Sequence, residues 1–285
     1  MDEAALSAML GRPVASVSRY ETAGISEVDL VTFADGERIV VKRAPDEWHW
    51  SIDKEVYVYG LVTRGTDVPV PRILGTPAPG TLVLSHVPGG GTADSDTVGL
   101  YRQIGALLAR LHAVHLDAFG YVGTHGVVEP HDTNGAYMRH QFTKKVREHA
   151  GLGGDEELGA RITAHVAERA YLFDACTTPS LCHNDCHEGN LIARDGCVVA
   201  LVDFQNAVGG DPLLDLAKCA CYSQRDRETV VASLAAGYGA LPGAWHDALD
   251  LYVLYHQLEL WDWFATIGMR EHLDAIEQTM RATVG

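Results

Sequence analysis

Nine residues, "CHNDCHEGN" from Cys182 to Asn190, concentrate side chains that could do chemistry. The first six hold two cysteines, two histidines and an aspartate. Thiols and imidazoles bind zinc, and the Cys182-x3-Cys186 spacing is acceptable for it, but a structural zinc site usually takes its ligands as two separated pairs. Cys219-x-Cys221 would be a poor second pair, and haem attachment needs Cys-x-x-Cys-His, which is one residue shorter. A zinc or haem site is therefore the weaker hypothesis.

The oxygen-bearing side chains of the same stretch favour a different chemistry. His183-x-Asp185-x4-Asn190, followed by Asp203, has the order of groups used in phosphoryl transfer. There, one Asp accepts the proton of the substrate hydroxyl or orients that hydroxyl, while an Asn and a second Asp hold Mg²⁺. The pattern predicts a phosphoryl-transfer site.

A hairpin would bring the two predicted metal ligands together. A two-residue turn at Asp195-Gly196 would place Asn190 opposite Leu201, so that Asp203 emerges at the same open end. Hard oxygen ligands that meet at one point are what Mg²⁺ with bridging phosphates requires.

Two segments, "LCHNDCHEGNLI" and "LVDFQNAVGGDPLLDLA", together resemble the aminoglycoside phosphotransferase and choline kinase family. "RIVVKR", "VPVPRIL" and "GALLARLHAVH" resemble further family segments, so the resemblance covers most of the chain. It implies an α+β, bilobal, protein-kinase-like fold with a small antiparallel-sheet N-lobe and a larger, mostly helical C-lobe. It also implies ATP (or GTP) and Mg²⁺ as cofactors.

The chain departs from the family pattern at several positions. The family usually has Gly at the position of Asn184, Leu or Phe at that of Cys186, and Pro at that of Glu188. After Phe204, where an acidic residue is common, this chain has Gln205 and Asn206. None of these changes removes a group that the chemistry needs. They leave the subfamily open.

The resemblance implies roles for the C-lobe residues. Asp185 is expected to be the catalytic base or the group that orients the hydroxyl, and a turn or N-cap Asp is its structural alternative. His183 is expected to brace the loop by hydrogen bonds rather than to titrate. Asn190 and Asp203 are the expected metal ligands, and Asp215 is expected to anchor the catalytic loop.

In the N-lobe, Lys42 is the expected ATP lysine and Glu55 its partner on the following helix. Strand alternation turns Arg43 to the opposite face, although a solvated strand lysine is the common alternative. Lys54 neighbours Glu55 but is expected to point away from the pair.

The remaining nucleotide contacts are predicted from weaker signals. In "ETAGISEV", Gly24 and Ser26 could offer a backbone N–H and a hydroxyl to the phosphates, although an ordinary turn would look the same. The hinge, Ser85 to Val87, is expected to bind adenine through its backbone.

The elements that must position these groups follow from periodicity. A hairpin is predicted around Asp35-Gly36, a helix over 52–65, a buried strand from 81 and a domain boundary at Gly89–Gly91. This gives an N-lobe of residues 1–88 and a C-lobe of residues 89–285. Helical patterns fit 97–115, 155–174, 212–239 and 244–282, with one short β island at 190–204.

Composition excludes several classes of protein. A chain of 285 residues suggests two lobes, and its net charge of −16 argues against nucleic acid or an anionic membrane as partner. The first 88 residues carry a net charge of −4 and the remaining residues a net charge of −12. The N-terminus resembles no secretory signal, so a cytoplasmic location with six reduced cysteines is expected. Oligomeric state is not predicted.

A small-molecule substrate is implied because Asp203 is followed within eight residues by Asp211-Pro212, which leaves no room for a peptide platform. The acidic C-lobe suggests a cationic substrate, with Glu259 and Asp262 as candidate contacts, although a solvent-exposed helix face would show the same pattern. Phosphorylation of an aminoglycoside or similar antibiotic is the hypothesis. The alternatives are a kinase of choline, a sugar, homoserine or a non-aminoglycoside antibiotic, and a nucleotide-binding pseudokinase.

Overall fold

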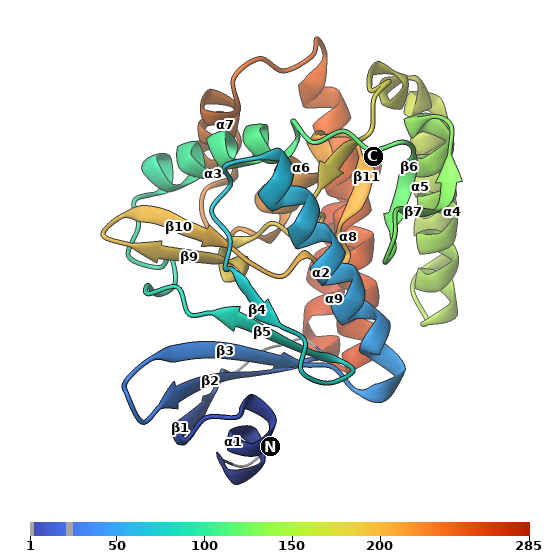
Figure 1. The fold of residues 1–285 in the computed structure, drawn as a ribbon. Coiled ribbons are helices and arrows are strands. Elements are labelled where there is room, and N and C mark those ends of the chain that lie inside the picture. The colour runs from blue at the N-terminus through green and yellow to red at the C-terminus, as the bar shows by residue number, and fades with distance from the viewer. Residues whose placement is uncertain (1–2, 21–24) are drawn as a thin grey trace.

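The computed structural model describes residues 3–20 and 25–285. The chain forms an antiparallel-sheet N-lobe and a mostly helical C-lobe, so the predicted fold class is confirmed (Figure 1). The N-lobe sheet has the order β1-β2-β3-β5-β4, and every pair in it is antiparallel. Its elements are α1 (Glu3–Leu10), β1 (Val14–Arg19), β2 (Glu27–Phe33), β3 (Arg38–Arg43), α2 (His49–Gly65), β4 (Ile73–Gly75) and β5 (Thr81–Ser85).

The C-lobe contains helices, a second sheet and a separate hairpin. Its helices are α3 (Thr97–Leu111), α4 (Asn134–Gly151), α5 (Glu156–Arg169), α6 (Leu213–Tyr222), α7 (Arg227–Tyr238), α8 (Trp245–Ile267) and α9 (Leu273–Val284). The sheet has the order β7-β6-β11-β8, formed by β6 (Phe119–Val122), β7 (Val127–His131), β8 (Ser180–Cys182) and β11 (Val208–Gly210). The hairpin is β9 (Leu191–Arg194) with β10 (Cys197–Leu201).

Both predicted hairpin turns are present. Gly36 has φ of +86°, and Asp195 and Gly196 have φ of +53° and +75°. Positive φ at both Asp195 and Gly196 is the mark of a type I′ turn, whereas at Asp35-Gly36 the glycine alone has positive φ, which its lack of a Cβ permits. The predicted helices over 52–65 and 97–115 correspond to α2 and α3.

Other expectations for the C-lobe were wrong. The pattern over 212–239 is two helices separated at 223–226, and the lobe contains a four-stranded sheet besides the expected β island. Its strands are three to five residues long, too short to show alternation, and the β11 sequence VGG has no hydrophobic period. Helix α4 is polar along much of its length, which weakens the helical pattern that would predict it.

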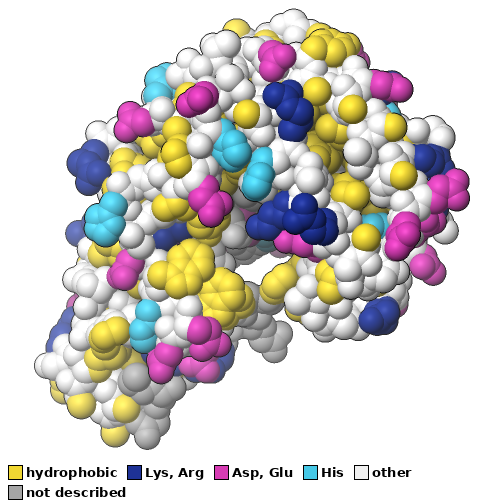
Figure 2. Space-filling model, turned by 90° about the vertical axis from the view of Figure 1, so that its right-hand side faces the viewer, with side chains coloured by type: hydrophobic (Ala, Val, Ile, Leu, Met, Phe, Trp, Pro, Cys, Tyr) yellow, Lys and Arg dark blue, Asp and Glu magenta, His cyan; other side chains and the backbone are white. Residues whose placement is uncertain are grey.

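One hydrophobic cluster runs through both lobes, with Ile52, Val58 and Leu82 from the N-lobe part packed together with the C-lobe core. A smaller cluster lies between α1 and the N-lobe sheet and includes Leu6 and Phe33. The division of the chain at 88/89 stays a prediction. A hollow separates the two parts on the face shown in Figure 2, and both acidic and basic side chains border it. Within residues 3–20 and 25–285, no helix has the length and apolar character needed to cross a bilayer.

Candidate functional site

The N-lobe side of the site is an ion-paired lysine. Strand β3 turns Lys42 inward, and its Nζ lies 2.8 Å from Glu55 Oε2 on α2 and 2.9 Å from Asp203 Oδ1. Burial acts against the charge, but these two carboxylates raise the pKa of Lys42 above its usual range. Arg43, the next residue, pairs instead with Glu27. The pairing with Glu55 and the different direction of Arg43 agree with the sequence prediction, and the role of Lys42 as the ATP lysine stays a prediction.

The C-lobe side is the loop that contains Asp185. Asp185 Oδ2 accepts hydrogen bonds from Asn190 Nδ2 at 3.3 Å and Asn206 Nδ2 at 3.2 Å, while Oδ1 lies 3.5 Å from Lys218 Nζ. Burial raises the pKa of Asp185, but Lys218 and the other polar groups around it, Asn206 among them, outweigh this effect and hold the pKa below its usual value. The carboxylate is therefore ionised and fixed in orientation.

His183 braces this loop, as expected. The ring is fully buried, Nδ1 accepts a hydrogen bond from the Asp185 N–H at 3.2 Å, and Nε2 lies 3.0 Å from the Val202 carbonyl. These partners assign the neutral tautomer with the proton on Nε2. Both ring nitrogens are engaged with the backbone, and no solvent-facing nitrogen remains for proton transfer.

Two residues of the site have left-handed backbone conformations. Asn184 has φ of +60° and Asp203 has φ of +69°. Non-glycine residues rarely adopt this region, and Asn and Asp tolerate it best. The Asn184 conformation explains why glycine is the family residue there and why Asn can replace it. Its N–H donates to Asp215 Oδ1 at 2.6 Å and the His183 N–H donates to Asp215 Oδ2 at 2.7 Å, so Asp215 anchors the loop as expected.

The predicted metal ligands lie at the same end of the hairpin, in a different register from the one expected. A bulge between Val198 and Ala200 pairs Leu201 with Leu191, and the Val202 N–H donates to the Asn190 carbonyl at 3.0 Å. Asn190 therefore lies next to the residue before Asp203. The extra residue of a bulge cannot be read from a hairpin sequence.

The donor set fits a hard cation. Asn190 Nδ2 donates to the Asp185 carbonyl at 2.8 Å, which leaves Oδ1 as its ligand atom, and Asp203 contributes a carboxylate. Oxygen ligands of this kind suit Mg²⁺.

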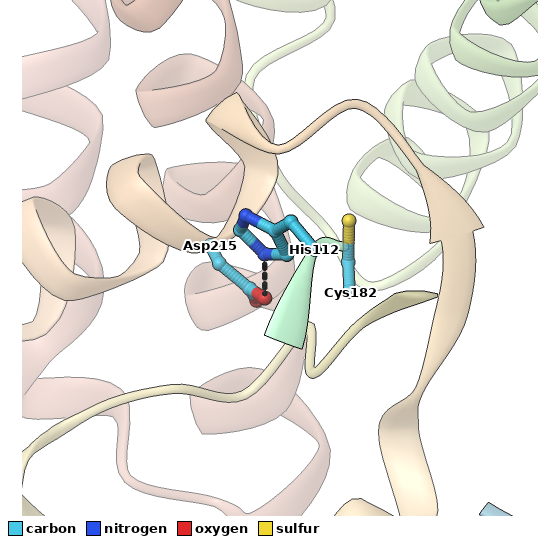
Figure 3. A group of neighbouring side chains, drawn as sticks. All are labelled: His112, Cys182 and Asp215. Carbon is cyan, nitrogen blue, oxygen red and sulfur yellow. Dashed lines mark hydrogen bonds and ion pairs between the residues drawn. The ribbon is translucent and has the colours of Figure 1, made fainter. Parts of the chain in front are cut away.

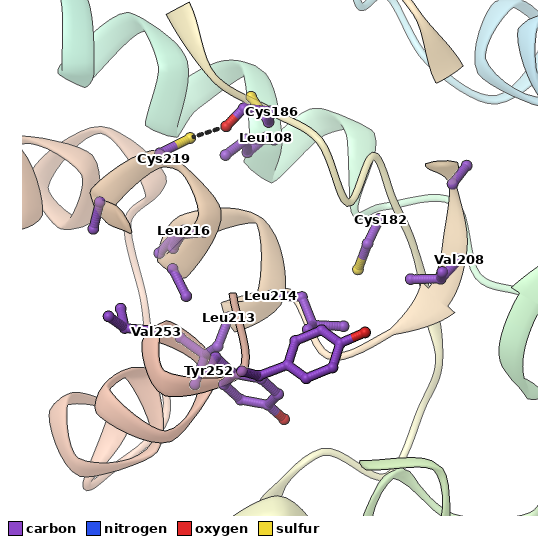
Figure 4. Packing of buried hydrophobic residues seen from close by; sticks show 14 of the residues in the cluster. Leu108, Cys182, Cys186, Val208, Leu213, Leu214, Leu216, Cys219, Tyr252 and Val253 are labelled. Carbon is purple, nitrogen blue, oxygen red and sulfur yellow. Dashed lines mark hydrogen bonds between the residues drawn. The ribbon is translucent and has the colours of Figure 1, made fainter. Parts of the chain in front are cut away.

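The thiols do not form a metal box (Figure 4). Cys182, Cys186 and Cys219 are buried in the apolar core, and the Cys219 thiol donates to the Cys186 carbonyl at 3.1 Å. Burial raises the pKa of Cys182, and the hydrogen bond with Cys219 together with burial raises that of Cys186, as expected for thiols packed in an apolar core.

One cluster within the described part of the chain has metal-like spacing: His112, Cys182 and Asp215 (Figure 3). His112 Nε2 lies 2.9 Å from Asp215 Oδ2 and Nδ1 lies 3.0 Å from the Tyr238 hydroxyl. Both Asp215 oxygens already accept backbone hydrogen bonds from the catalytic loop. The cluster is therefore a hydrogen-bonded anchor for that loop.

The structure describes some of the residues predicted to contact the nucleotide. Gly24 lies outside the described residues, and Ser26 is buried next to β2. Ser85 ends β5, donates its N–H to the Arg72 carbonyl at 2.8 Å and accepts the Arg72 N–H on its hydroxyl. Its N–H is thus unavailable to adenine, which was not expected. The adenine contact of Val87, just beyond the strand, stays a prediction.

The two acids proposed as substrate contacts are paired within the protein. Glu259 lies 3.5 Å from Lys218 Nζ and accepts from His256 Nδ1 at 2.6 Å, and Asp262 lies 3.3 Å from Lys145 Nζ. Both acids therefore already have a basic neighbour, and their role as substrate contacts stays a prediction.

Several residues of the site were missed from the sequence. Asn206 donates a hydrogen bond to Asp185, and Lys218 Nζ lies 3.5 Å from it. His187, considered only as a zinc ligand, lies 3.8 Å from Asp185 Oδ1 with its ring stacked on Tyr222. A lysine inside the apolar segment "LLDLAKCACY" was the available signal for Lys218.

Glu188 also has a role that the sequence did not reveal. It accepts hydrogen bonds from Thr92 Oγ1 at 2.6 Å, from the Tyr101 hydroxyl at 2.8 Å and from Arg225 Nε and Nη2 at 2.9 and 3.0 Å. This network ties the catalytic loop to the segment that joins the lobes. Its members are distant in sequence, so no local pattern predicts it.

Comparison with known proteins places this geometry in a family. The model of the phosphotransferase enzyme family (APH) matches residues 23–251, which is most of the chain.

Three solved structures illustrate the likeness. One assigned as a fructosamine-3-kinase from Thermobifida fusca is 22% identical with a TM-score of 0.75, and the match covers 99% of this chain and 98% of that one. A thermostable mutant of aminoglycoside phosphotransferase APH(4)-Ia, in complex with ADP and hygromycin B, is 16% identical with a TM-score of 0.77, and the match covers 99% of this chain and 97% of that one. Macrolide 2′-phosphotransferase MphH from Brachybacterium faecium is 18% identical (TM-score 0.67; 99% and 97%). At these identities the likeness establishes the fold.

Proposed function

Because the chain belongs to the phosphotransferase enzyme family and is a small-molecule phosphotransferase, we propose that it transfers the γ-phosphate of ATP to a hydroxyl of its substrate. One observation carries the proposal. Lys42 Nζ lies between Glu55 and Asp203 at 2.8 and 2.9 Å, with the ionised Asp185 on the loop whose Asn190 adjoins Asp203. Lys42 suits the phosphates of a nucleotide, Asn190 and Asp203 suit a cation, and Asp185 suits a hydroxyl.

Each of these groups has a distinct role in the proposed reaction. Lys42, aimed by Glu55, binds ATP phosphate oxygens, and Asp185 orients the acceptor hydroxyl and takes its proton. Asn190 and Asp203 would hold Mg²⁺, which neutralises charge on the phosphates when bound. His183 keeps the loop in place through its two backbone contacts.

The acceptor is a small molecule because nothing resembling a peptide platform follows Asp203. The short stretch between Asp203 and Asp211 is taken up by a 3-10 turn at Phe204–Asn206 and by β11, after which α6 begins. A protein kinase would place a long activation segment here.

The finer hypothesis is an aminoglycoside or similar antibiotic as substrate. Its support is the net charge of −16 and the likeness to a structure with hygromycin B bound. The pairing of Glu259 with Lys218 favours a second candidate, a neutral or zwitterionic hydroxyl metabolite, because the Glu259 carboxylate already has a cationic partner within the protein. The cytoplasmic location stays a prediction.

The test is coupled release of ADP from Mg·ATP. Aminoglycosides, macrolides, peptide antibiotics, choline, sugars and fructosamines would be offered to the wild type, to Asp185→Ala and to Asp67→Ala, whose side chain is 80% exposed. Turnover that is lost in Asp185→Ala and kept in Asp67→Ala supports the proposal. ATP binding with no turnover of any acceptor and no hydrolysis would instead identify a pseudokinase.

A further inference from the structure

A buried lysine on α6 stands next to the carboxylate proposed to orient the acceptor. Lys218 is 5% exposed, and it lies in a helix whose other buried residues are mostly apolar. An ammonium group is rarely buried unless it is paired, because removing it from water is unfavourable. Its position therefore requires a reason beyond packing.

The neighbours of Lys218 keep it charged. Its Nζ lies 3.5 Å from Asp185 Oδ1, 3.5 Å from Glu259 Oε2 and 4.3 Å from the centre of the Tyr222 ring. Burial acts against the charge, but Glu259, Tyr222 and Asp185 together raise the pKa of Lys218 well above its usual range. The side chain remains an ammonium at neutral pH.

These contacts are longer than those of the other buried cation of the site. Lys42 Nζ lies 2.8 and 2.9 Å from its two carboxylates, whereas both carboxylates of Lys218 lie at 3.5 Å. Charge-assisted hydrogen bonds are typically about 2.7–2.9 Å long. Lys218 also shares a side-chain hydrogen bond with Tyr222, but the two long carboxylate contacts leave its ammonium, with three N–H donors, capacity to donate to a ligand as well.

The carboxylates beside Lys218 do not depend on it for their positions. Glu259 is held by the Tyr255 hydroxyl at 3.0 Å and by His256 at 2.6 Å. Asp185 is held through its other oxygen by Asn190 and Asn206. A lysine needed only to fix these carboxylates would duplicate existing hydrogen bonds.

Resting on the proposed function, we propose that Lys218 is a further catalytic residue, whose ammonium contacts the phosphoryl group as it passes to the hydroxyl oriented by Asp185. In this step the acceptor oxygen forms a bond to the γ-phosphorus, and the bond from phosphorus to the β,γ-bridging oxygen breaks. The electron pair leaves with ADP, and the hydroxyl proton passes to Asp185. Lys218 keeps its proton and offsets the repulsion between the Asp185 carboxylate and the phosphoryl oxygens.

The experiment compares Lys218→Met, Lys218→Arg and wild type by ADP release with a turned-over acceptor and with water as acceptor. Lys144→Met is the matched control, since it removes the same charge from a lysine whose side chain is 57% exposed. We expect Lys218→Met to lower kcat by about 100-fold with KM for ATP within about threefold, the pattern of an interaction made in the transition state. Lys218→Arg should recover part of kcat, and Lys144→Met should match wild type.

Binding of Mg·ADP with aluminium fluoride, a mimic of the phosphoryl group in transfer, gives a second readout. Wild type and Lys218→Arg should bind Mg·ADP more tightly when aluminium fluoride is present, and Lys218→Met should lose this gain while its affinity for Mg·ADP alone is unchanged. A retained gain, or a kcat of Lys218→Met near wild type, overturns the catalytic role. Lys218→Gln replaces Lys218→Met if the latter does not fold. A wild type that neither binds Mg·ADP nor releases ADP would refute the proposed function itself.

Discussion

Replacing Glu188 by Ala tests whether the network around the catalytic loop stabilises the fold. The carboxylate accepts four hydrogen bonds at 2.6 to 3.0 Å, two of them from Arg225, and the side chains of Glu188 and Arg225 are 26% and 19% exposed. Hydrogen bonds to a charged group are worth about 1.5–3 kcal/mol each, but they add incompletely and this site is partly exposed, so Glu188→Ala should lower the free energy of unfolding by about 3 kcal/mol. Arg225 keeps three other acceptors, at Ser95, Thr97 and Thr92, which limits the loss.

The assay is urea denaturation followed by tryptophan emission, with Glu168→Ala as the matched control. Glu168 also contacts an arginine, at 3.1 Å, but its side chain is 72% exposed, so its loss should cost less than about 0.5 kcal/mol. A double-mutant cycle of Glu188→Ala with Arg225→Met should give a coupling energy of about 1–3 kcal/mol. If Glu188→Ala were as mild as Glu168→Ala, or if the cycle were additive, the reasoning from the hydrogen-bond network would be refuted.

Three further predictions concern a buried pair, a buried lysine and the thiols. Lys42→Met should abolish ADP release. It should also lower the free energy of unfolding by about 3 kcal/mol, because Glu55 is left buried without its partner. The double variant Lys42→Met with Glu55→Leu should regain much of the stability but none of the activity. Burial lowers the pKa of Lys54 to about 6, so between pH 6 and 10 the unfolded chain binds the extra proton and the free energy of unfolding rises with pH by up to about 1.4 kcal/mol per unit. Urea titrations of wild type and Lys54→Met at pH 7, 8 and 9 check this; an equal slope in both would mean that Lys54 stays charged in the fold. An aromatic disulfide reagent should label the exposed Cys197 first and the buried Cys186 only after unfolding, and a melting temperature lowered by chelator would revive the zinc hypothesis.

The chemistry of the site was predictable because it depends on residue types at short spacings. His183, Asp185 and Asn190 lie within eight residues, and a predicted turn brought Asp203 to the end of the same hairpin. Lys42 was predictable because strand alternation and the following helix fix its direction locally. The bulge in the hairpin was not, because a bulge leaves no mark in hydrophobic alternation.

The residues whose surroundings the sequence did not reveal are those with distant partners. Glu259 and Asp262 belong to an acidic segment and suggested a cationic substrate, yet Lys218 and Lys145 from other helices lie 3.5 and 3.3 Å from them. Lys54 was expected to point away from Glu55 and does, but its burial against the Ala207 carbonyl was not foreseen. Charge in a sequence is counted along the chain, whereas a site experiences charge in space.

The sequence by itself therefore determined the class of chemistry and the order of the groups that perform it. These depend on local spacing, turn residues and strand alternation, which act over a few positions of the chain. The tertiary structure decided which charges remain for a ligand, how the catalytic loop is anchored by Asp215 and Glu188, and that Lys218 stands beside Asp185. Those outcomes follow from contacts between helices and loops more than thirty residues apart, whose free energies arise only when burial excludes water and brings the partners together.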